Sequence, residues 1–442
     1  MFPLTDQHIS KALERLGMPD VASATIRQIV ALASVLEQDA GEKFIRLELG
    51  NPGIPAEDRG IEAQCEALRS GCPRVYPDVW GLPALKQAAS RFLKSFLDVD
   101  IAPKGIIPTV GSMQASFTLQ LLLRQRIEGK DTILFINPGF PAQRHQAKVL
   151  GIRQESFDIY NYRGEALAAK LEEVLSSGRI TAMIYSNPNN PAWINLTEEE
   201  LRIIGDAATV HDVMVIEDLA YLGMDFRTDF SHPDQPPFIP SVAKYTRNCI
   251  LLVSASKIFS YAGERIALAC MPDGVYHRRY QALADFYDMP AFGDAYVFGV
   301  LYTASSGTSH SAQYAMAAML DAAVRGELDF VGHTREYGRR AALVKKAFLD
   351  CGFRQVYERD GDRPVSDGFF FTMGYGDLTG DQLQEELLKY GISTISLAAT
   401  GSKQQGVRGT VSMITDDAMV DTLRSRLLQF QKDHLGTQAS GL

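Results

Sequence analysis

The sequence has little cysteine and no spacing that would pair what it has. Of 442 residues only five are cysteine, an odd number, and no two of them form a CxxC motif. This pattern argues against a disulfide framework and against a zinc site. Cys249 and Cys270 lie in apolar runs, where we expect small core residues. We therefore expect a protein of a reducing compartment, the cytoplasm.

Basic charge and long apolar runs are also scarce. The net charge of -9 argues against nucleic acid as the main partner, because phosphate backbones need clustered lysine and arginine. No apolar run reaches the length of a membrane span, and the first residues lack the basic and apolar regions of a signal peptide. We therefore expect no association with a membrane. The remaining composition, 46% hydrophobic and 22% charged, is that of an ordinary globular protein.

Apolar runs of strand length alternate with longer helical patterns in the middle of the chain. The runs 132–136, 182–185, 213–216 and 249–253 are expected to be strands. Helical patterns cover 113–126 and 198–208, and Thr197 with Glu200 forms a capping box before the second. Continuous apolar strands separated by helices predict an α/β fold with a mostly parallel sheet covered on both faces. Ligands of such sheets bind beyond the carboxyl ends of the strands.

The pattern changes after about residue 330. A long amphipathic stretch at 335–349 precedes an apolar run at 368–372 and a helix opened by Thr379 and Gln382. This order is typical of a smaller α+β domain, which the helical and then extended N-terminal segment is expected to join. We therefore expect a large domain over 56–329 and a small domain formed by 1–55 and 330–442.

Lys257 stands at the end of the apolar run 249–253, in Ser254-Ala255-Ser256-Lys257, with Arg265 eight positions further on. A lysine amine can attack a carbonyl once it has lost its proton, and partial burial near other cations favours that loss. The alternative is a lysine that ends a strand without a chemical role. This run alone does not decide between the two interpretations.

Other polar motifs also follow expected strands. In Thr109-Val110-Gly111-Ser112-Met113 a glycine turn opens a helix, and its backbone N–H groups and positive helix end suit a phosphate. The remaining motifs, in chain order, are Tyr76 five residues before Gly81, Asn137-Pro138-Gly139-Phe140, Asn187-Pro188-Asn189-Asn190-Pro191, Asp218 with Tyr221, and Arg408 in Gly406-Val407-Arg408-Gly409.

In this order and spacing the motifs resemble those of the fold-type-I pyridoxal-phosphate enzymes, specifically the class I/II aminotransferases typified by aspartate aminotransferase. The resemblance extends from about residue 47 to about residue 412. It implies pyridoxal 5'-phosphate as cofactor, and transfer of an amino group from an L-amino acid to a 2-oxo acid by a ping-pong Schiff-base mechanism. A lyase or decarboxylase on the same scaffold is the alternative, because one sequence does not show which α-bond lies perpendicular to the cofactor ring.

The resemblance assigns chemical roles to four residues. Lys257 would hold the cofactor as a Schiff base and, once freed, move a proton at the substrate α-carbon. Asp218 would pair with the pyridine nitrogen and keep it protonated, and Tyr221 and Asn190 would bond the phenolic oxygen. An aspartate after an apolar strand is otherwise a common turn residue or helix cap.

The resemblance also implies contacts to the phosphate and to the substrate. Phe140 would stack on the ring face, or it is a plain core phenylalanine. Arg408 would grip the α-carboxylate beside a loop that contains Gly50, or it is a surface arginine. Tyr76 would reach the phosphate of a neighbouring subunit, which implies a homodimer with shared active sites. The residues expected to bind the phosphate of the same subunit are Gly111, Ser112, Met113, Ser254, Ser256 and Arg265.

Two regions depart from the family pattern. Relatives carry Asn-Pro-Thr-Gly where this chain has Asn190-Pro191-Ala192-Trp193, so Trp193 either reshapes the substrate pocket or packs beneath it. The region 285–300 contains three aspartates and no arginine, so we do not expect a strictly dicarboxylate pocket. Its aromatic residues suit either an apolar substrate side chain or an interface core: Phe286, Tyr287, Phe292, Tyr296 and Phe298.

A non-enzymatic class is also known for this fold, the transcription regulators that carry a winged-helix domain. Fewer than about 50 residues precede the motif region here, and they are not basic, which disfavours this class.

Overall fold

The computed structural model describes residues 2–438 and divides into two compact units. Unit 1 comprises the described residues up to Gly53, the segment Asn190–Ile194 and the described residues from Arg335 onward, and unit 2 comprises Ile54–Asn189 and Asn195–Thr334. The sequence-based division, 1–55 with 330–442 and 56–329, differs from this one by a few residues at the boundaries. It also differs in the segment Asn190–Ile194, which unit 1 includes.

A seven-stranded sheet forms the centre of unit 2, with the strand order β2-β8-β7-β6-β5-β3-β4. Strand β8 is antiparallel to both of its neighbours, and the other pairings are parallel, so the expected mostly parallel α/β sheet is confirmed. The strands are β2 (Ile106–Val110), β3 (Thr132–Asn137), β4 (Arg153–Asp158), β5 (Ile180–Ser186), β6 (Met214–Asp218), β7 (Cys249–Ser254) and β8 (Ile266–Cys270).

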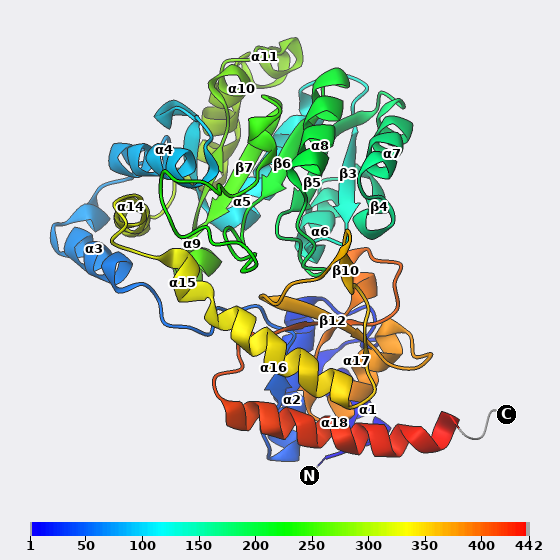
Figure 1. Ribbon diagram of the computed structural model, residues 1–442. Helices are drawn as coiled ribbons and strands as arrows, with labels where there is room; N and C mark the ends of the chain where they lie inside the picture. The colour runs from blue at the N-terminus through cyan, green and yellow to red at the C-terminus, as the bar shows by residue number, and fades with distance from the viewer. Residues whose placement is uncertain (1, 439–442) are drawn as a thin grey trace. The chain divides into compact units, whose positions relative to one another are not determined.

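Helices cover this sheet, as Figure 1 shows. Helix α5 packs against β5, β6, β7 and β8. The helices of unit 2 are α3 (Asp58–Arg69), α4 (Pro83–Leu97), α5 (Gly111–Gln125), α6 (Pro141–Val149), α7 (Glu165–Leu175), α8 (Glu198–Val210), α9 (Ala255–Ile258), α10 (Asp273–Tyr276), α11 (Gln281–Tyr287), α12 (Phe292–Asp294), α13 (Tyr302–Ser305), α14 (His310–Val324) and α15 (Phe330–Thr334).

The start of α8 shows how the sequence sets a helix boundary. The hydroxyl of Thr197 accepts the N–H of Glu200 at 3.2 Å, and the Glu200 carboxylate accepts the N–H of Thr197 at 3.0 Å. The expected capping box is therefore confirmed. Apolar side chains of α5 meet those of β5, β6 and β7 in one buried cluster, which fixes the sheet beneath the strand ends.

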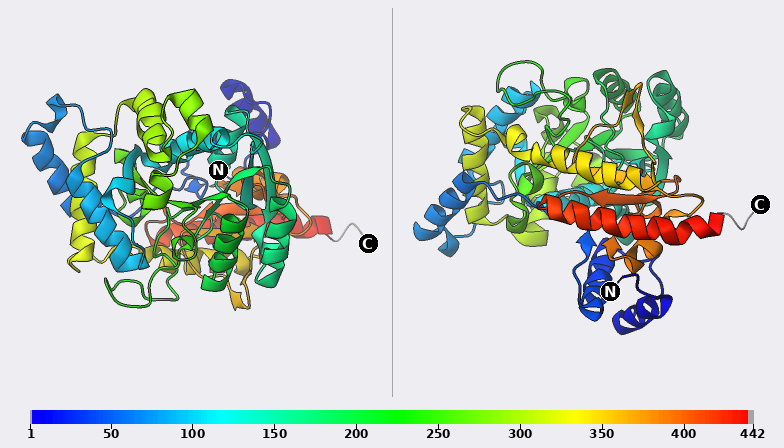
Figure 2. Two further views of the ribbon diagram at one scale, coloured as in Figure 1. Left: turned by 90° about the horizontal axis from the view of Figure 1, so that it is seen from above. Right: turned by 60° about the horizontal axis from the view of Figure 1, so that its bottom comes forward.

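Unit 1 contains a four-stranded antiparallel sheet with the order β14-β15-β12-β9. Helices α16 and α18 lie side by side in the views of Figures 1 and 2. The capping box of Thr379 and Gln382 at the start of α17 is confirmed. The elements are α1 (Asp6–Leu16), α2 (Ile26–Ala40), β1 (Ile45–Arg46), α16 (Glu336–Asp350), β9 (Arg354–Gln355), β10 (Arg359–Asp360), β11 (Arg363–Pro364), β12 (Phe370–Gly374), α17 (Gly380–Lys389), β13 (Ile392–Ser393), β14 (Ile395–Ser396), β15 (Val407–Thr410) and α18 (Asp417–Gln438).

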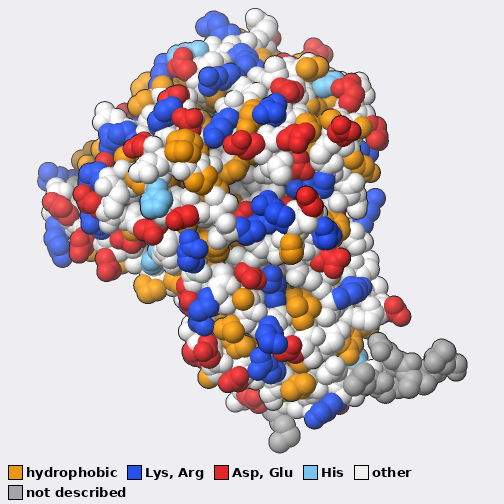
Figure 3. Space-filling view, viewed as in Figure 1, with side chains coloured by type: hydrophobic (Ala, Val, Ile, Leu, Met, Phe, Trp, Pro, Cys, Tyr) orange, Lys and Arg blue, Asp and Glu red, His pale blue; other side chains and the backbone are white. Residues whose placement is uncertain are grey.

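Charged side chains of both signs are interspersed over the face shown in Figure 3. Within residues 2–438, no helix combines the length and the apolar character that a membrane crossing requires. The same described residues contain no group of three or more His, Cys, Asp or Glu side chains that could hold a metal ion.

Candidate functional site

The ends of three strands bring several of the predicted residues of unit 2 to one edge of the sheet. Strand β6 ends at Asp218, and its neighbour β7 ends at Ser254 and leads into α9, which carries Lys257. Strand β2 ends at Val110, opposite the first residue of β8, so α5 begins at the same edge. Adjacent strands lie about 4.8 Å apart, which keeps these ends close together.

Asp218 is buried, with 6% of its surface exposed. Gln143 Nε2 donates to its Oδ2 at 2.9 Å, and the N–H of Ala220 donates to its Oδ1 at 3.2 Å. Burial raises the pKa of Asp218 to about 6, although both hydrogen bonds favour the ionised form. A buried carboxylate of this kind gains most from a cationic partner, such as a protonated ring nitrogen.

Gln143 belongs to a buried network of amide side chains between α5 and α6, and sequence reasoning missed it. Gln120 Nε2 donates to the backbone carbonyl of Gln143 and to Oε1 of Gln146, both at 3.2 Å. Gln146 Nε2 in turn donates to the carbonyl of Met113 at 2.9 Å. The network therefore connects the Asp218 carboxylate with the turn at the start of α5. Glutamines within a helical pattern usually lie on the surface, so the sequence contains no signal for it.

The turn at the start of α5 has the features of an anion site. Gly111 has a left-handed φ of 69°, and a side chain there would overlap the guanidinium of Arg265. The Ser112 hydroxyl is buried and has no hydrogen-bond partner among the described residues. A positive helix end, a guanidinium and an unpaired hydroxyl at one place fit a phosphate. Met113, in the same turn, is 39% exposed.

The segment after β7 leaves the core at Ser256 and Lys257. The hydroxyl of Ser254 caps α9 by accepting the N–H of Ser256 at 3.2 Å. Residues 249–255 are all buried, whereas Ser256 and Lys257 are half-buried. The strand and its cap therefore hold the backbone of Lys257 firmly while its side chain begins at the boundary of the core.

The other predicted residues of unit 2 differ in their surroundings. Tyr221 is buried, with 6% exposed, three residues after Asp218. Phe140 is half-buried and stands at the N-cap of α6, before Pro141. Tyr76 is 88% exposed and lines a surface pocket of about 500 Å³ with Cys72 and His310, so the structure does not bring it to the strand edge of its own unit.

In unit 1, Arg408 of β15 is buried, with 2% exposed. Its Nη2 donates to the carbonyl of Glu48 at 2.7 Å, and its guanidinium carbon lies 5.0 Å from the centre of the Phe370 ring. Phe370 was not expected to take part. Its position is explained by register, because Thr372 pairs with Arg408 and side chains two residues apart point to the same face of a strand.

The segment that contains Gly50 runs beside β15, since the hydroxyl of Thr410 donates to the carbonyl of Leu49 at 3.1 Å. A Cβ at Gly50 would make an ordinary contact of 3.4 Å with the Phe369 ring. At Gly53, by contrast, a Cβ would overlap the backbone carbonyl of Ser412. Packing therefore requires glycine at residue 53 and not at residue 50.

Asn190 and Trp193 belong to unit 1 and are buried, with 3% and 0% exposed. The Trp193 ring packs edge-on against Phe370, with 6.1 Å between the ring centres. The aromatic residues at 286–298, for which a substrate pocket and an interface core were both considered, have different surroundings in the structure. Phe292 and Tyr296 are completely buried in the core of unit 2, whereas Phe286 on α11 is 65% exposed.

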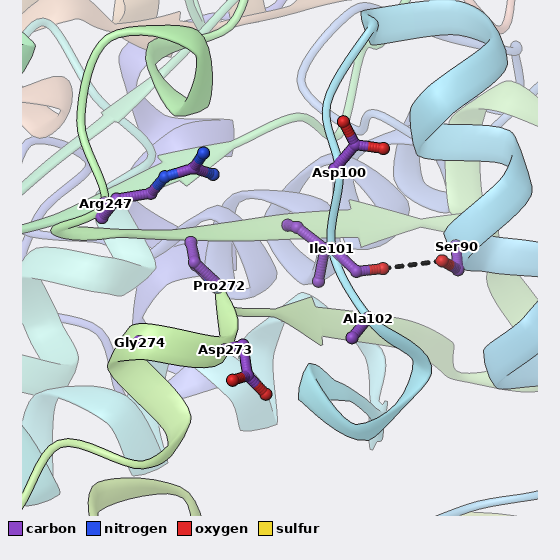
Figure 4. Close-up of a pocket in the computed structure, with 8 residues that line it drawn as sticks. All are labelled: Ser90, Asp100, Ile101, Ala102, Arg247, Pro272, Asp273 and Gly274. Carbon is purple, nitrogen blue, oxygen red and sulfur yellow. Dashed lines mark hydrogen bonds between the residues drawn. The ribbon is translucent and has the colours of Figure 1, made fainter.

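A pocket of about 560 Å³ lies at the opposite edge of the sheet of unit 2, where β7 begins and β8 ends (Figure 4). Ser90, whose hydroxyl donates to the carbonyl of Ile101 at 2.6 Å, lines it together with Arg247 and Asp273. None of the sequence-predicted site residues lines this pocket.

Known proteins of similar sequence include aminotransferases. The chain is 26% identical over 262 residues to an aspartate aminotransferase of Pyrococcus horikoshii, a match that covers 58% of this chain and 61% of that relative. It is also 26% identical over 239 residues to an asparagine–oxo-acid transaminase of Streptococcus mutans, covering 52% of this chain and 56% of the relative. Both matches span less than two thirds of the relatives' own lengths.

Among solved structures, that of the Thermus thermophilus aspartate aminotransferase with maleate has a TM-score of 0.73 to this chain at 20% identity. The similarity covers 97% of this chain and 100% of that one, which shows that the fold is shared. Residues 42–427, most of the chain, match the family described as aminotransferase class I and II. The chain belongs to the family of class I and II aminotransferases.

Proposed function

We propose that this chain is an aminotransferase that uses pyridoxal 5'-phosphate to move an amino group from an L-amino acid to a 2-oxo acid. Enzymes of this family generally use that cofactor. The observation that carries the proposal is the meeting of Asp218, Lys257 and the Gly111 turn at the carboxyl edge of one sheet. When bound, the cofactor supplies an electron-accepting ring conjugated to the substrate α-carbon.

The phosphate of the cofactor is proposed to lie at the start of α5. Arg265 lies against Gly111, so its guanidinium and the positive end of helix α5 meet at one place. An anion bound there would interact favourably with both. A phosphate there would accept from the arginine fork and from the Ser112 hydroxyl. The complete proposed set of phosphate contacts is Gly111, Ser112, Met113, Ser254, Ser256 and Arg265.

The ring of the cofactor is proposed to be held by one charged side chain, Asp218, and by several neutral side chains. Asp218 would accept from the protonated ring nitrogen, and that cation would lower the Asp218 pKa from its raised value of about 6. Tyr221 and Asn190 would donate to the phenolic oxygen. Phe140 would cover one face of the ring.

Lys257 is proposed as the residue that moves the proton. Its Nζ would hold the cofactor covalently and, when freed, would take the proton from the substrate α-carbon and return it. The position of Lys257 supports this role, because it is half-buried and directly follows the capped end of a buried strand.

Arg408 is proposed to hold the α-carboxylate of the substrate, beside the segment that contains Gly50. Its guanidinium is held by the Glu48 carbonyl, which accepts from Nη2, and it lies over the Phe370 ring. A carboxylate that accepts two parallel N–H bonds is a strong partner for such a group.

We also propose a homodimer in which Tyr76 of one subunit reaches the cofactor phosphate of the other. Large apolar side chains exposed on unit 2 support this assembly, since Tyr76 is 88% exposed and Val75 and Tyr302 are each 56% exposed. The proposed location is the cytoplasm. It is supported by the five cysteines, all within the described residues and all free thiols.

The visible absorbance spectrum of the purified protein tests the proposal. A yellow protein that loses its colour with one L-amino acid, and releases the corresponding 2-oxo acid, is expected. Lys257→Ala should fold normally and bind cofactor without turnover, because the group that moves the proton is missing. Circular dichroism and thermal unfolding of this variant check the fold.

Other results would contradict the proposal. Release of ammonia or carbon dioxide in place of the 2-oxo acid would move the function to elimination or decarboxylation on the same scaffold. Measurable amino transfer by Lys257→Ala would disprove the role of that lysine. A colourless protein that cannot be reconstituted with pyridoxal 5'-phosphate would overturn the cofactor proposal.

A further inference from the structure

Trp193 has a backbone conformation that bulky residues rarely adopt. Its φ is 60°, in the left-handed region, and none of its side chain is exposed. Such a residue is strained by its own Cβ, and the conformation persists only where the surroundings fix it. The sequence therefore retains a large side chain at a place where the backbone favours glycine.

Gly368 faces the indole of Trp193. A Cβ at residue 368 would overlap the indole ring, at the Cε2, Nε1 and Cζ2 atoms. Any other residue there would have to displace the tryptophan. Trp193 and Gly368 thus form a matched pair, in which the bare backbone of one provides the space that the ring of the other fills.

The indole is the outer member of a row of three groups that ends at Arg408. Trp193 packs against Phe370 with 6.1 Å between ring centres and an angle of 61° between ring planes. The guanidinium carbon of Arg408 lies 5.0 Å from the centre of the same Phe370 ring. All three residues belong to unit 1, so the row lies within one compact body.

We propose that Trp193 is a positioning residue for the carboxylate grip: it holds the Phe370 ring, and through that ring it fixes the plane of the Arg408 guanidinium. This inference rests on the proposed role of Arg408. The Glu48 carbonyl fixes one Nη of the arginine, and the aromatic face fixes its tilt. With one Nη and the tilt of the plane both fixed, the Arg408 guanidinium is pre-organised to bind a planar carboxylate. Such pre-organisation strengthens binding.

A purely structural role for Trp193 predicts a different result, and Phe348 provides the matched control. Phe348 of α16 is also a completely buried aromatic residue of unit 1. It packs on Phe371, at 5.4 Å between ring centres. Phe371 is adjacent in the strand to Phe370 and points to the opposite face of β12. If loss of buried aromatic area alone mattered, truncating either ring completely should weaken acid binding to a similar extent, in Phe348→Ala as in Trp193→Gly.

The test measures binding of carboxylates to the cofactor-loaded protein. The probes are 3-phenylpropanoate, 4-methylpentanoate and succinate, each compared with its uncharged amide. We expect Trp193→Gly and Phe370→Leu each to weaken binding of the acids about tenfold, with no change for the amides. Trp193→Phe should lose less affinity for the acids, since an aromatic ring remains at residue 193. The double variant of residues 193 and 370 should be no weaker than Phe370→Leu alone, because both act through one ring.

A second measurement does not depend on Trp193→Gly folding. The chain has two tryptophans, Trp80 and Trp193. In Trp80→Phe the emission reports Trp193 alone, and addition of the acids should change it. In Trp80→Phe combined with Arg408→Ala the acids should leave the emission unchanged. An emission that ignores the acids in the first protein would overturn the inference.

The variants separate failure of this inference from failure of the proposed function. If Arg408→Ala binds the acids as well as the wild type does, Arg408 is not the carboxylate grip, and both statements are wrong. If Arg408→Ala loses the acids while both Trp193 variants retain wild-type affinity, only the inference is wrong. An equal loss of acid binding in Trp193→Gly and Phe348→Ala would also overturn it, by reducing Trp193 to a core residue.

Discussion

Asp218 of unit 2 and Arg408 of unit 1 are both buried ionisable side chains, but they are stabilised in different ways. Asp218 accepts two hydrogen bonds, and burial still raises its pKa to about 6. Arg408 donates to the backbone carbonyl of Glu48 and lies over the Phe370 ring. Asp218 can therefore become neutral by taking up a proton, whereas a guanidinium keeps its proton and its charge.

The difference indicates how each region should respond to its ligand. Without a cationic partner, the carboxylate of unit 2 can adapt to pH, so its ligand should act on stability in a pH-dependent way. Arg408 of unit 1 keeps its charge at all ordinary pH values. Its loss should therefore appear mainly as weaker binding of a carboxylate ligand, and not as a pH-dependent change in stability. Three substitutions test this comparison.

Arg408→Ala should have the largest effect. We expect the KM of the amino-acid substrate to rise about 100-fold, because a buried, pre-organised charge pair is lost, while cofactor retention changes little. Steady-state kinetics and the visible spectrum measure the two quantities. Arg426→Ala is the matched control, since Arg426 is another buried arginine of unit 1 whose guanidinium donates to the carbonyls of Gly391 and Lys43.

The control should lower stability and leave KM unchanged. Equal loss of substrate affinity and cofactor retention in Arg408→Ala would mean that the arginine does not grip the substrate. Arg408 would then have no ligand of its own, and the comparison between the Asp218 carboxylate and the Arg408 guanidinium would lose its basis.

Asp218→Asn tests the other half of the comparison through pH. Because the folded-state pKa of Asp218 lies above its usual 3.8, the group stabilises the fold fully below about pH 4 and loses that contribution as pH rises through about 6. The shift corresponds to about 3 kcal/mol. Without cofactor, the free energy of unfolding of Asp218→Asn should therefore rise relative to that of the wild type, by up to that amount, as pH increases from about 4 to about 6. Denaturant unfolding measures this difference.

With cofactor bound, the wild type should instead be the more stable of the two proteins. The Asp218 carboxylate then gains a cationic partner, and the asparagine of the variant does not. Glu217→Gln provides the control: burial raises the pKa of Glu217 to about 7, and its carboxylate bonds to Ser241 and to the N–H of Val242. The stability difference between Glu217→Gln and the wild type should be the same with and without cofactor. If Asp218→Asn behaves like this control, Asp218 does not face the cofactor.

The four strands predicted from the sequence are all buried on both faces. The runs expected at 132–136, 182–185, 213–216 and 249–253 are the cores of β3, β5, β6 and β7. Strand β4 was missed because its sequence, Arg-Gln-Glu-Ser-Phe-Asp, is polar, as suits an edge strand with exposed side chains. Strands β2 and β8 were not predicted although they are almost entirely buried, so burial alone does not decide which strands the pattern reveals.

The candidate site was predictable where a residue at a strand end also belongs to a motif that resembles the family pattern. Asp218 and Lys257 are of this kind, and their roles remain predictions. Gln143 and Phe370 could not be found in this way, because each matters only through a partner far away in the sequence: Asp218, 75 residues away, for Gln143, and Arg408 for Phe370. Local sequence contains no information on such pairs.

Gln143→Leu should have the smallest effect of the three substitutions. Leucine retains most of the volume but removes the donor to Asp218 Oδ2, so the pKa of the carboxylate should rise further and its ionised form should be less populated at neutral pH. A hydrogen bond to a charged group is worth roughly 1.5–3 kcal/mol, so the affinity for pyridoxal 5'-phosphate should fall about tenfold or more.

Gln154→Leu is the matched control, because Gln154 of β4 donates to the backbone carbonyl of Arg144 and not to a carboxylate among the described residues. Its affinity for the cofactor should remain that of the wild type. Since Gln143 acts on a proton equilibrium, the deficit of Gln143→Leu should shrink as pH rises and the carboxylate ionises without help. A deficit that is constant with pH would mean that the glutamine only fills space between α5 and α6. The amide network would then be a packing feature, and Asp218 would rely on its backbone hydrogen bond alone.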